Sequence, residues 1–361
     1  MKKALHLGMI YLIFCMTKVY GQLFPKLGAQ RAGISALTFL KIDSSPRSAG
    51  MAGAQVAVQG DAYATSYNVA GLADNETKNF AAANTFYVAG TNHAFFSAML
   101  PHPKLGNFAL HATSFTTGAM ERRTEFQPLG TGEYFYAYNV AVGLAYSKKL
   151  TEMFSYGISL KYINETLDRF VAHTMAIDLG FLYRTDFTDL KFAVSLQNFG
   201  PNSKLKGNKP NLPLSKPQKD LESNPSPTNF SLGISMIPIK KEKHQLLTIV
   251  QLNHPNDNAE NIRIGLEYGF HQLLFFITGY KINVKDQPYP TFGLGIKTRY
   301  TKHPLLIDYA IDPTLYLGWI HRIGVILFIN KDSREDASNE PQPKQKKLKK
   351  KSSTETTEQP K

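Results

Sequence analysis

The run at 155–162, Ser-Tyr-Gly-Ile-Ser-Leu-Lys-Tyr, decides the fold class, because large apolar residues alternate in it with small or polar ones. Similar runs lie at 175–183, 230–236 and 262–268. Successive side chains of a β-strand point to opposite faces, so each run has one apolar face and one polar face. The apolar face is rich in Phe, Tyr, Leu and Ile, and the unit recurs about every ten to eighteen residues. This pattern predicts an all-β fold, a transmembrane antiparallel β-barrel.

The predicted barrel contains about fourteen strands between residues 78 and 330. Their expected centres are Tyr87, Phe96, Leu110, Val142, Ile158, Leu179, Val194, Leu232, Leu247, Ile264, Phe276, Leu294, Ile307 and Val325. If the first strand runs outward, the long connections 117–133 and 200–228 both fall on the outer side, as outer-membrane barrels require. A count of roughly twelve or sixteen strands preserves this agreement, so both remain alternatives.

The N-terminus has the composition of a secretory signal peptide. A basic start, Met1-Lys2-Lys3, precedes an apolar run at 4–16 and then small or polar residues up to Gly21. This order predicts cleavage after Gly21. The apolar run is too short to anchor the chain as a membrane helix. Because bulky Phe14 precedes Cys15, we do not expect lipidation of that cysteine.

Cysteine content and hydropathy narrow the class further. Cys15 is the only cysteine and lies in the expected signal peptide, so the mature chain has neither disulfide nor thiol chemistry. No later run of eighteen apolar residues exists, and the mean hydropathy is −0.24, which excludes helical spans. Only a closed barrel then satisfies every backbone polar group in lipid. The predicted location is the bacterial outer membrane.

The net charge of +13 does not indicate a nucleic-acid partner. Many lysines lie at expected turns, such as Lys148-Lys149 and Lys240-Lys241, and others lie in the tail at 331–361. No DNA- or RNA-binding motif is present. We therefore expect solvated surface charge, with contact to an acidic partner or to lipid head groups as the alternative.

Four regions divide the chain: a signal peptide at 1–21, an N-terminal plug or hatch segment at 22–77, the barrel at 78–330, and a basic tail at 331–361. The second region is rich in Gly, Ala and Ser, so it can pack tightly against a wall inside the barrel. The tail has almost no apolar residues, which predicts disorder.

The plug region holds the densest motif of the chain. Its candidate residues are Arg47, Gly50, Met51, Gly53, Asp61, Tyr67, Asn68 and Gly71. At these residues the chain resembles the PorV/PorQ family of outer-membrane proteins, which is related to the FadL-type fatty-acid transporters. Further segments similar to the family lie at 192–200, 264–268, 306–310 and 321–324. The chain departs from the family at Val69, where proline is usual, and at Ala52, where glycine is frequent.

The resemblance implies a FadL-like barrel of fourteen strands and a role in type IX protein secretion. PorV-like members accompany the large translocon and collect secreted substrates by their C-terminal sorting domains, and PorQ-like members work at the same surface assembly. The implied partners are thus a translocon subunit, secreted proteins, or both, within outer-membrane lipid. The resemblance does not separate the two subfamilies.

Two other functions remain open. One is a FadL-like transporter of hydrophobic small molecules, although the expected inward faces of Gly, Ser, Ala and charged residues disfavour a fully apolar tunnel. The other is an enzyme in a barrel. We expect no enzyme, cofactor or metal site, because HExxH spacing, a G-x-S-x-G elbow and a Walker loop are all lacking. Asp178 and Glu267 lie at inward strand positions, where we expect pairing with lumen Lys or Arg residues or a place along a ligand path.

Two expected outer loops carry candidate partner-contact residues. One contains Glu121, Arg122 and Arg123. The other, at 200–228, contains Lys204, Lys206 and Lys209 together with several prolines that stiffen it. An ordinary solvated or variable loop is the alternative in both cases.

Overall fold

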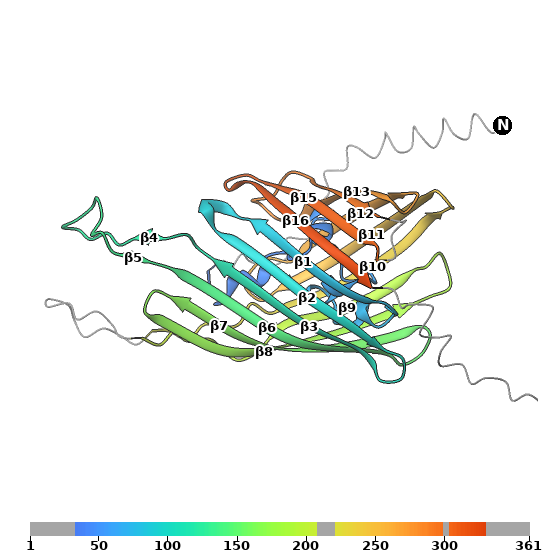
Figure 1. Ribbon diagram of the computed structural model, residues 1–361, viewed down its shortest axis with the longest axis horizontal. Helices are drawn as coiled ribbons and strands as arrows, with labels where there is room; N and C mark the ends of the chain where they lie inside the picture. The colour runs from blue at the N-terminus through green and yellow to red at the C-terminus, as the bar shows by residue number, and fades with distance from the viewer. Residues whose placement is uncertain (1–32, 208–220, 299–302, 330–361) are drawn as a thin grey trace, which may run out of the picture. The chain divides into compact units, whose positions relative to one another are not determined.

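The computed structural model describes residues 33–207, 221–298 and 303–329. In this part of the chain, fourteen antiparallel strands close into one barrel in the order β1-β16-β15-β14-β13-β12-β11-β10-β9-β8-β7-β6-β3-β2 (Figure 1). Pairing of β1 with β16 closes the barrel. The predicted fold class and strand number are confirmed. The expected signal peptide at 1–21, the start of the plug region, Lys209 and the tail lie outside the described residues.

The barrel strands are β1 Lys78–Phe86, β2 Asn92–His102, β3 Gly106–Thr116, β6 Ala137–Lys149, β7 Phe154–Leu167, β8 Phe170–Arg184, β9 Lys191–Phe199, β10 Asn229–Lys240, β11 His244–Pro255, β12 Asn261–Phe270, β13 Leu274–Ile282, β14 Thr291–Lys297, β15 Leu305–Thr314 and β16 Gly318–Ile329. The short strands β4 (Met120–Glu121) and β5 (Tyr134–Phe135) form a separate two-stranded sheet.

The predicted centre of the first strand, Tyr87, is wrong, because β1 already ends at Phe86. The middle of β1 is an alanine run, Ala81 to Ala83, which lacks the large apolar residues that mark the lipid-facing side of the other strands. The nearest large apolar residues are Phe86 and Tyr87 at the end of the strand, so the predicted centre was placed too far along the chain. The other predicted centres lie within observed strands.

The alternating pattern separates lipid-facing from lumen-facing side chains. On β7, Ile158, Leu160 and Tyr162 are exposed on the outside, whereas Ser159 and Lys161 are buried inside. A closed barrel leaves no unpaired strand edge, and the apolar exterior matches the hydrocarbon core of a bilayer. This architecture is that of a bacterial outer-membrane barrel, so the predicted location is confirmed. Within the described residues, no helix is long and apolar enough to span a membrane.

The two ends of the barrel differ in their connections. The segments 117–136 and 200–228 follow the third and seventh strands of the barrel, so both leave the same end, called here the long-loop end. At the opposite, short-turn end, the connections include 103–105, 150–153 and 241–243. The predicted placement of the two long loops on one side is confirmed.

Residues 36–77, called here the lumen segment, form short helices inside the barrel: η2 Thr38–Lys41, α2 Pro46–Gly50, η3 Ala62–Ser66 and η4 Val69–Leu72. A further short helix, η5 Val88–Gly90, lies in the turn between β1 and β2. Helix α2 contacts β13 to β16, and η4 contacts β6 to β8, so the segment reaches across the lumen between distant strands (Figure 1). Polar side chains cap three of these helices: Ser45, Asp61 and Asn68 accept hydrogen bonds from N–H groups two or three residues ahead.

Candidate lumen site

Glycines on the inner wall allow the lumen segment to approach the strand backbone closely. A Cβ atom at Gly279 would lie 2.3 Å from the carbonyl carbon of Met51, and one at Gly180 would lie 2.1 Å from Oδ1 of Asn68. Other strand glycines that face the segment are Gly157, Gly233, Gly265, Gly293 and Gly324. These mid-strand glycines therefore form a close-packed inner wall.

A buried ion pair fixes the lumen segment to the wall. Arg47 donates from Nε and Nη2 to the two carboxylate oxygens of Glu267 on β12, at 2.5 and 2.7 Å. Both side chains are largely buried. Glu267, which the strand pattern placed in the lumen, therefore pairs with the arginine of the plug motif. Two parallel hydrogen bonds make this contact geometrically specific.

Asp61 and Asn68 form hydrogen bonds with the backbone of the lumen segment between residues 56 and 70. Asp61 accepts a hydrogen bond from the N–H of Tyr63 at 2.9 Å. Burial raises the pKa of Asp61 above its usual value, and the charge of Arg47 and this N–H oppose that rise. Asn68 accepts from the N–H of Ala70 at 3.1 Å and donates to the carbonyl of Val56 at 2.7 Å. These side chains therefore hold three turns of the segment together.

The eight residues of the plug motif come together in the lumen but have two different roles. Arg47, Gly50, Met51, Asp61, Asn68 and Gly71 pack the segment against itself and against the wall. Gly53 and Tyr67 instead line a cavity above it. Gly53 has a φ of +78°, and a Cβ atom there would lie 2.1 Å from Nη1 of Arg263, so glycine is required on both counts.

A ladder of amide side chains links the segment to β11 and β12. Oε1 of Gln251 accepts from the N–H groups of Gln55 and Val56, both at 2.9 Å. Nε2 of Gln251 donates to Asn253 at 2.7 Å, and Asn253 donates to Asn261 at 3.2 Å. These amides were not among the predicted site residues, although their inward positions on β11 and β12 indicate that they face the lumen.

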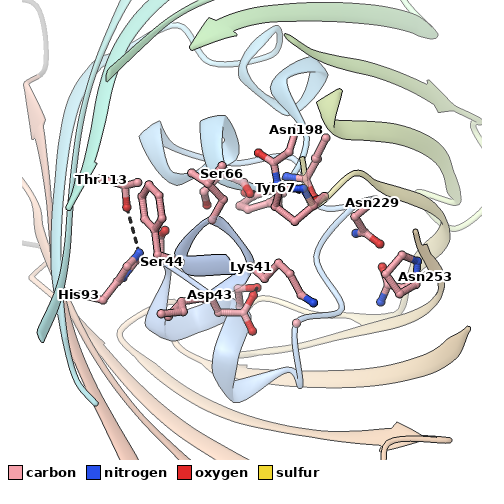
Figure 2. A pocket seen from close by; sticks show the side chains of 18 of the residues that line it. Lys41, Asp43, Ser44, Ser66, Tyr67, His93, Thr113, Asn198, Asn229 and Asn253 are labelled. Atoms are coloured by element: carbon pink, nitrogen blue, oxygen red, sulfur yellow. Dashed lines mark hydrogen bonds between the residues drawn. The ribbon is translucent and has the colours of Figure 1, made fainter. Parts of the chain in front are cut away.

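A cavity of about 220 Å³ lies inside the barrel, above the lumen segment (Figure 2). Lys41, Asp43, Ser44, Ser66 and Tyr67 contribute from the segment. His93, Thr113, Asn198, Asn229 and Asn253 contribute from the barrel wall. These wall residues lie in the strand halves nearer the long-loop end. The site, called here the cup, therefore lies toward that end, between the barrel wall and the lumen segment, whose Ala36 and Lys41 bond to Pro225 and Asp257 in the connections of the same end.

A second cavity of about 670 Å³ shares a wall with the first and is lined by charged groups of β13, β15 and β16. Asp312 lies between Nζ of Lys281 at 3.4 Å and Nη1 of Arg322 at 3.6 Å. Arg263 and Lys281 line both cavities. Of these residues only Arg322 lies in a segment singled out from the sequence, at 321–324, and the pairing of neighbouring strands from β12 to β16 brings the four around one space.

The second inward acid, Asp178, is also paired. Its Oδ1 lies 2.8 Å from Nζ of Lys161 and accepts from the N–H of Asn198 at 2.7 Å. Lys161 also donates to the side chain of Asn198. This contact lies where the register shifts between β8 and β9. The expected pairing of inward acids with lumen cations is confirmed for both Asp178 and Glu267.

The candidate partner-contact loops divide into fixed and exposed residues. Glu121 lies in β4, and Arg122 is held by Asp168 at 3.0 Å and by Glu133 at 3.2 Å. Arg123 is exposed. The lysine loop is also partly ordered, because the backbone of Lys206 exchanges two hydrogen bonds of 2.8 Å with Val171. Lys204 lies two residues earlier in that loop, and Lys209 lies outside the described residues.

The hairpin of β4 and β5 projects beyond the barrel strands and ends in an apolar tip (Figure 1). Phe126 and Leu129 at this tip are 94% and 92% exposed. Arg122 and Asp168, called here the hairpin anchor, hold the base of this hairpin, and the hydrogen bond from Arg122 lowers the pKa of Asp168, so the carboxylate is charged at neutral pH.

Among the described residues, no group of three or more His, Cys, Asp or Glu side chains is placed to hold a metal ion.

Comparison with known proteins identifies relatives of the fold only. No protein-family model matches the chain, and no curated protein matches its sequence. The structure is similar to the Pseudomonas putida toluene transporter TodX, with 11% identity, coverage of 80% of this chain and 98% of that chain, and a TM-score of 0.50. It is also similar to the monoaromatic hydrocarbon channel CymD, with 12% identity, coverage of 79% and 96%, and a TM-score of 0.50.

A Pseudomonas aeruginosa FadL homologue matches with 9% identity, coverage of 79% and 97%, and a TM-score of 0.44. At such identities the likeness concerns the fold alone. The predicted architecture, a closed antiparallel barrel of fourteen strands, is confirmed and is shared with TodX and CymD, whereas the relation to FadL-type transporters and membership of the PorV/PorQ family stay predictions. The chain therefore forms a closed, fourteen-stranded outer-membrane barrel, and its architecture is similar to that of TodX and CymD.

Proposed function

We propose that the protein is an outer-membrane channel for small molecules of apolar or mixed character, with the lumen segment controlling passage. The observation that carries the proposal is the cavity inside the barrel, which lies toward the long-loop end between the wall and the lumen segment. The solved proteins of similar fold include a toluene transporter and a monoaromatic hydrocarbon channel. A substrate would enter from outside and meet the segment before reaching the periplasm.

The lumen segment has to move for this function. Ala49, Met51 and Ala52 have no exposed surface, and they lie against the inner faces of β12 to β14. Because protein interiors are close-packed, no path for a substrate exists where such residues meet the wall. Rearrangement of residues 46–73 therefore opens and closes the channel.

A disulfide lock tests the proposal. A Cβ atom built at Gly233 lies 2.3 Å from Cγ1 of Val56, so the two positions are adjacent, and cysteines there can bond after a small shift that sets their Cβ atoms roughly 3.5–4.5 Å apart. The only natural cysteine, Cys15, lies in the expected signal peptide. Uptake of labelled toluene would be measured in intact bacteria that carry the Val56→Cys/Gly233→Cys variant, with and without a membrane-permeant reductant.

We expect uptake above that of cells without the protein, loss of uptake in the oxidised variant, and recovery on reduction. The single variant Val56→Cys serves as the matched control and should transport under both conditions. Equal uptake with and without the protein for every small aromatic tested would rule out the channel.

A second candidate is a component of type IX secretion. It is supported by the resemblance at Arg47 to Gly71, and by the stiff hairpin that presents Phe126 and Leu129 to the outside. Here the filled lumen would serve as a stable scaffold, and the outer loops would contact the translocon or exported proteins. A tagged chain should then recover these partners in a native pull-down, and a variant with both Phe126→Ser and Leu129→Ser should recover less. Recovery of neither class of partner by the unaltered chain would remove this candidate.

A further inference from the structure

Cationic side chains dominate the charged lining of the smaller cavity. Lys41, Lys161, Arg263 and Lys281 line it, against the single carboxylate of Asp43. The carboxylates that pair with Lys41 and Lys161 are those of Asp257 and Asp178, and neither lines the cavity. The cavity therefore presents ammonium and guanidinium groups, while most of the compensating carboxylates lie behind them.

Arg263 differs from the other cations of the cup. It donates from Nε to Oδ1 of Asn261 at 3.0 Å and from Nη1 to the carbonyl of Gly53 at 3.4 Å. Within the described residues, none of its ion-pair distances to a carboxylate is 4.0 Å or less. An arginine held only by neutral acceptors keeps the capacity for a strong, charge-assisted bond to an anion.

Lys281 stands next to Arg263 on the neighbouring strand, where β12 and β13 pair Arg263 directly with Lys281. Its Nζ lies 2.5 Å from Oε1 of Gln287 and 3.4 Å from Asp312, so one carboxylate serves both Lys281 and Arg322. Nη1 of Arg322, which is 3% exposed, has no hydrogen-bond partner among the described residues. The shared wall of the two cavities thus carries Lys41, Arg263 and Lys281 with the carboxylate of Asp43, whereas Asp312 and Arg322 line the larger cavity only.

Three aromatic side chains also line the smaller cavity, among amide and hydroxyl side chains. Phe39, Tyr67 and Phe95 line it, and each is at least nine-tenths buried. Nδ1 of His93, also in the lining, has no hydrogen-bond partner within the described part of the chain. A cavity of about 150 Å³ accommodates benzene, so 220 Å³ accommodates a one-ring molecule with a small polar group.

We propose that this cup binds a small aromatic carboxylate, whose anionic group lies against Arg263 and Lys281 and whose ring lies against Phe39, Tyr67 and Phe95. The inference rests on the proposed channel function and narrows its substrate class from small molecules of apolar or mixed character to aromatic carboxylates. Arg263 binds the carboxylate, and Lys281 lowers the local cost of bringing the negative charge out of water.

Direct binding tests this proposal separately from transport. The full mature chain in detergent micelles would be titrated calorimetrically with benzoate, with toluene as the uncharged analogue, and with benzylamine as the analogue of opposite charge. We expect benzoate to bind most tightly, and its affinity to fall roughly 10-fold or more in Arg263→Gln, because a charge-assisted hydrogen bond is lost. Arg263→Lys should restore part of the loss.

Lys297→Gln is the matched control, since Lys297 is a barrel lysine that lines neither cavity. It should bind benzoate as the unaltered chain does, and the heat-dependent shift of the barrel on gels checks that each variant folds. Preference for toluene or benzylamine over benzoate, or equal benzoate affinity in Arg263→Gln and the unaltered chain, would overturn the anion site. Benzoate binding without uptake in cells would leave the anion site standing and remove the channel, whereas toluene uptake without benzoate binding would do the reverse.

Discussion

The two halves of the barrel interior use the same strands for opposite purposes. In the half occupied by α2, η3 and η4, the inner wall is complementary to the chain's own lumen segment, with glycines such as Gly279 where the backbone of the segment passes. In the half toward the long-loop end, the inner wall carries charged and amide side chains around two cavities. The same alternation of inward and outward residues thus builds a close-packed seat in one half and an open polar cup in the other.

Substitutions in the half packed against the lumen segment should change stability, whereas substitutions around the cavities should change binding. A change in the seat disturbs dry, close-packed contacts between the segment and the wall. A change in the cup meets free space and polar groups. Four sets of variants test this division between the close-packed half and the half with the cavities.

The Arg47–Glu267 pair should give the largest effect. Arg47→Met leaves the carboxylate of Glu267 buried without its partner, which typically costs about 3–5 kcal/mol. The double variant Arg47→Met/Glu267→Met removes both charges and should recover most of the loss. Urea unfolding in detergent micelles measures the three free energies of unfolding. Equal destabilisation by the single and double variants would contradict a buried, mutually dependent pair.

Gly279→Ala should come next. Its new Cβ atom would lie 2.3 Å from backbone of the segment, so either the segment or the strand has to shift, at a cost of about 1–3 kcal/mol. Gly118→Ala is the matched control, since a Cβ atom there would meet nothing within 4 Å. Unfolding midpoints compare the two. The division between seat and cup fails if both substitutions are equally tolerated.

Gln251→Leu should weaken the upper edge of the seat. It removes the acceptor shared by the N–H groups of Gln55 and Val56 and leaves both groups buried, at a cost of about 1–3 kcal/mol. Asn229→Ala, on the neighbouring wall of the cup, changes no contact with the segment and should leave the unfolding midpoint nearly unchanged. Hydrogen exchange at Gln55 and Val56 measures the local effect, and unchanged protection in Gln251→Leu would contradict it.

The hairpin anchor should show the smallest effect and a simple pH dependence. Because its hydrogen bond from Arg122 lowers the pKa of Asp168, the stabilisation is present at neutral pH and is lost as pH falls through that lowered pKa. Asp168→Asn should have the same consequence at neutral pH, namely faster protease cleavage within residues 122–133 with an unchanged barrel. Cleavage rates that are equal in both proteins at neutral pH would show that the hairpin is held by its backbone bonds alone.

The alternating strand pattern was sufficient to predict most of the fold. Runs such as 155–162 predicted which residues face lipid, the strand number and the side on which the long loops emerge, because these follow from a two-residue period and from antiparallel connection. The pattern failed at β1, where alanines conceal the alternation. It also placed Asp178 and Glu267 inside the barrel, without indicating that Glu267 pairs with a residue 220 positions earlier in the chain.

The order of residues along the chain was enough to predict the barrel, its lipid-facing side and the small-residue character of the lumen segment, since each depends on local order. Which inner surface the segment covers and which it leaves open became clear only in the folded barrel. Arg263, Lys281, Asp312 and Arg322 come from four strands, and only Arg322 lies in a segment singled out from the sequence, at 321–324. The pairing and register of neighbouring strands bring them around one space, and a pattern read along one strand at a time contains no information about which side chains on other strands lie beside it.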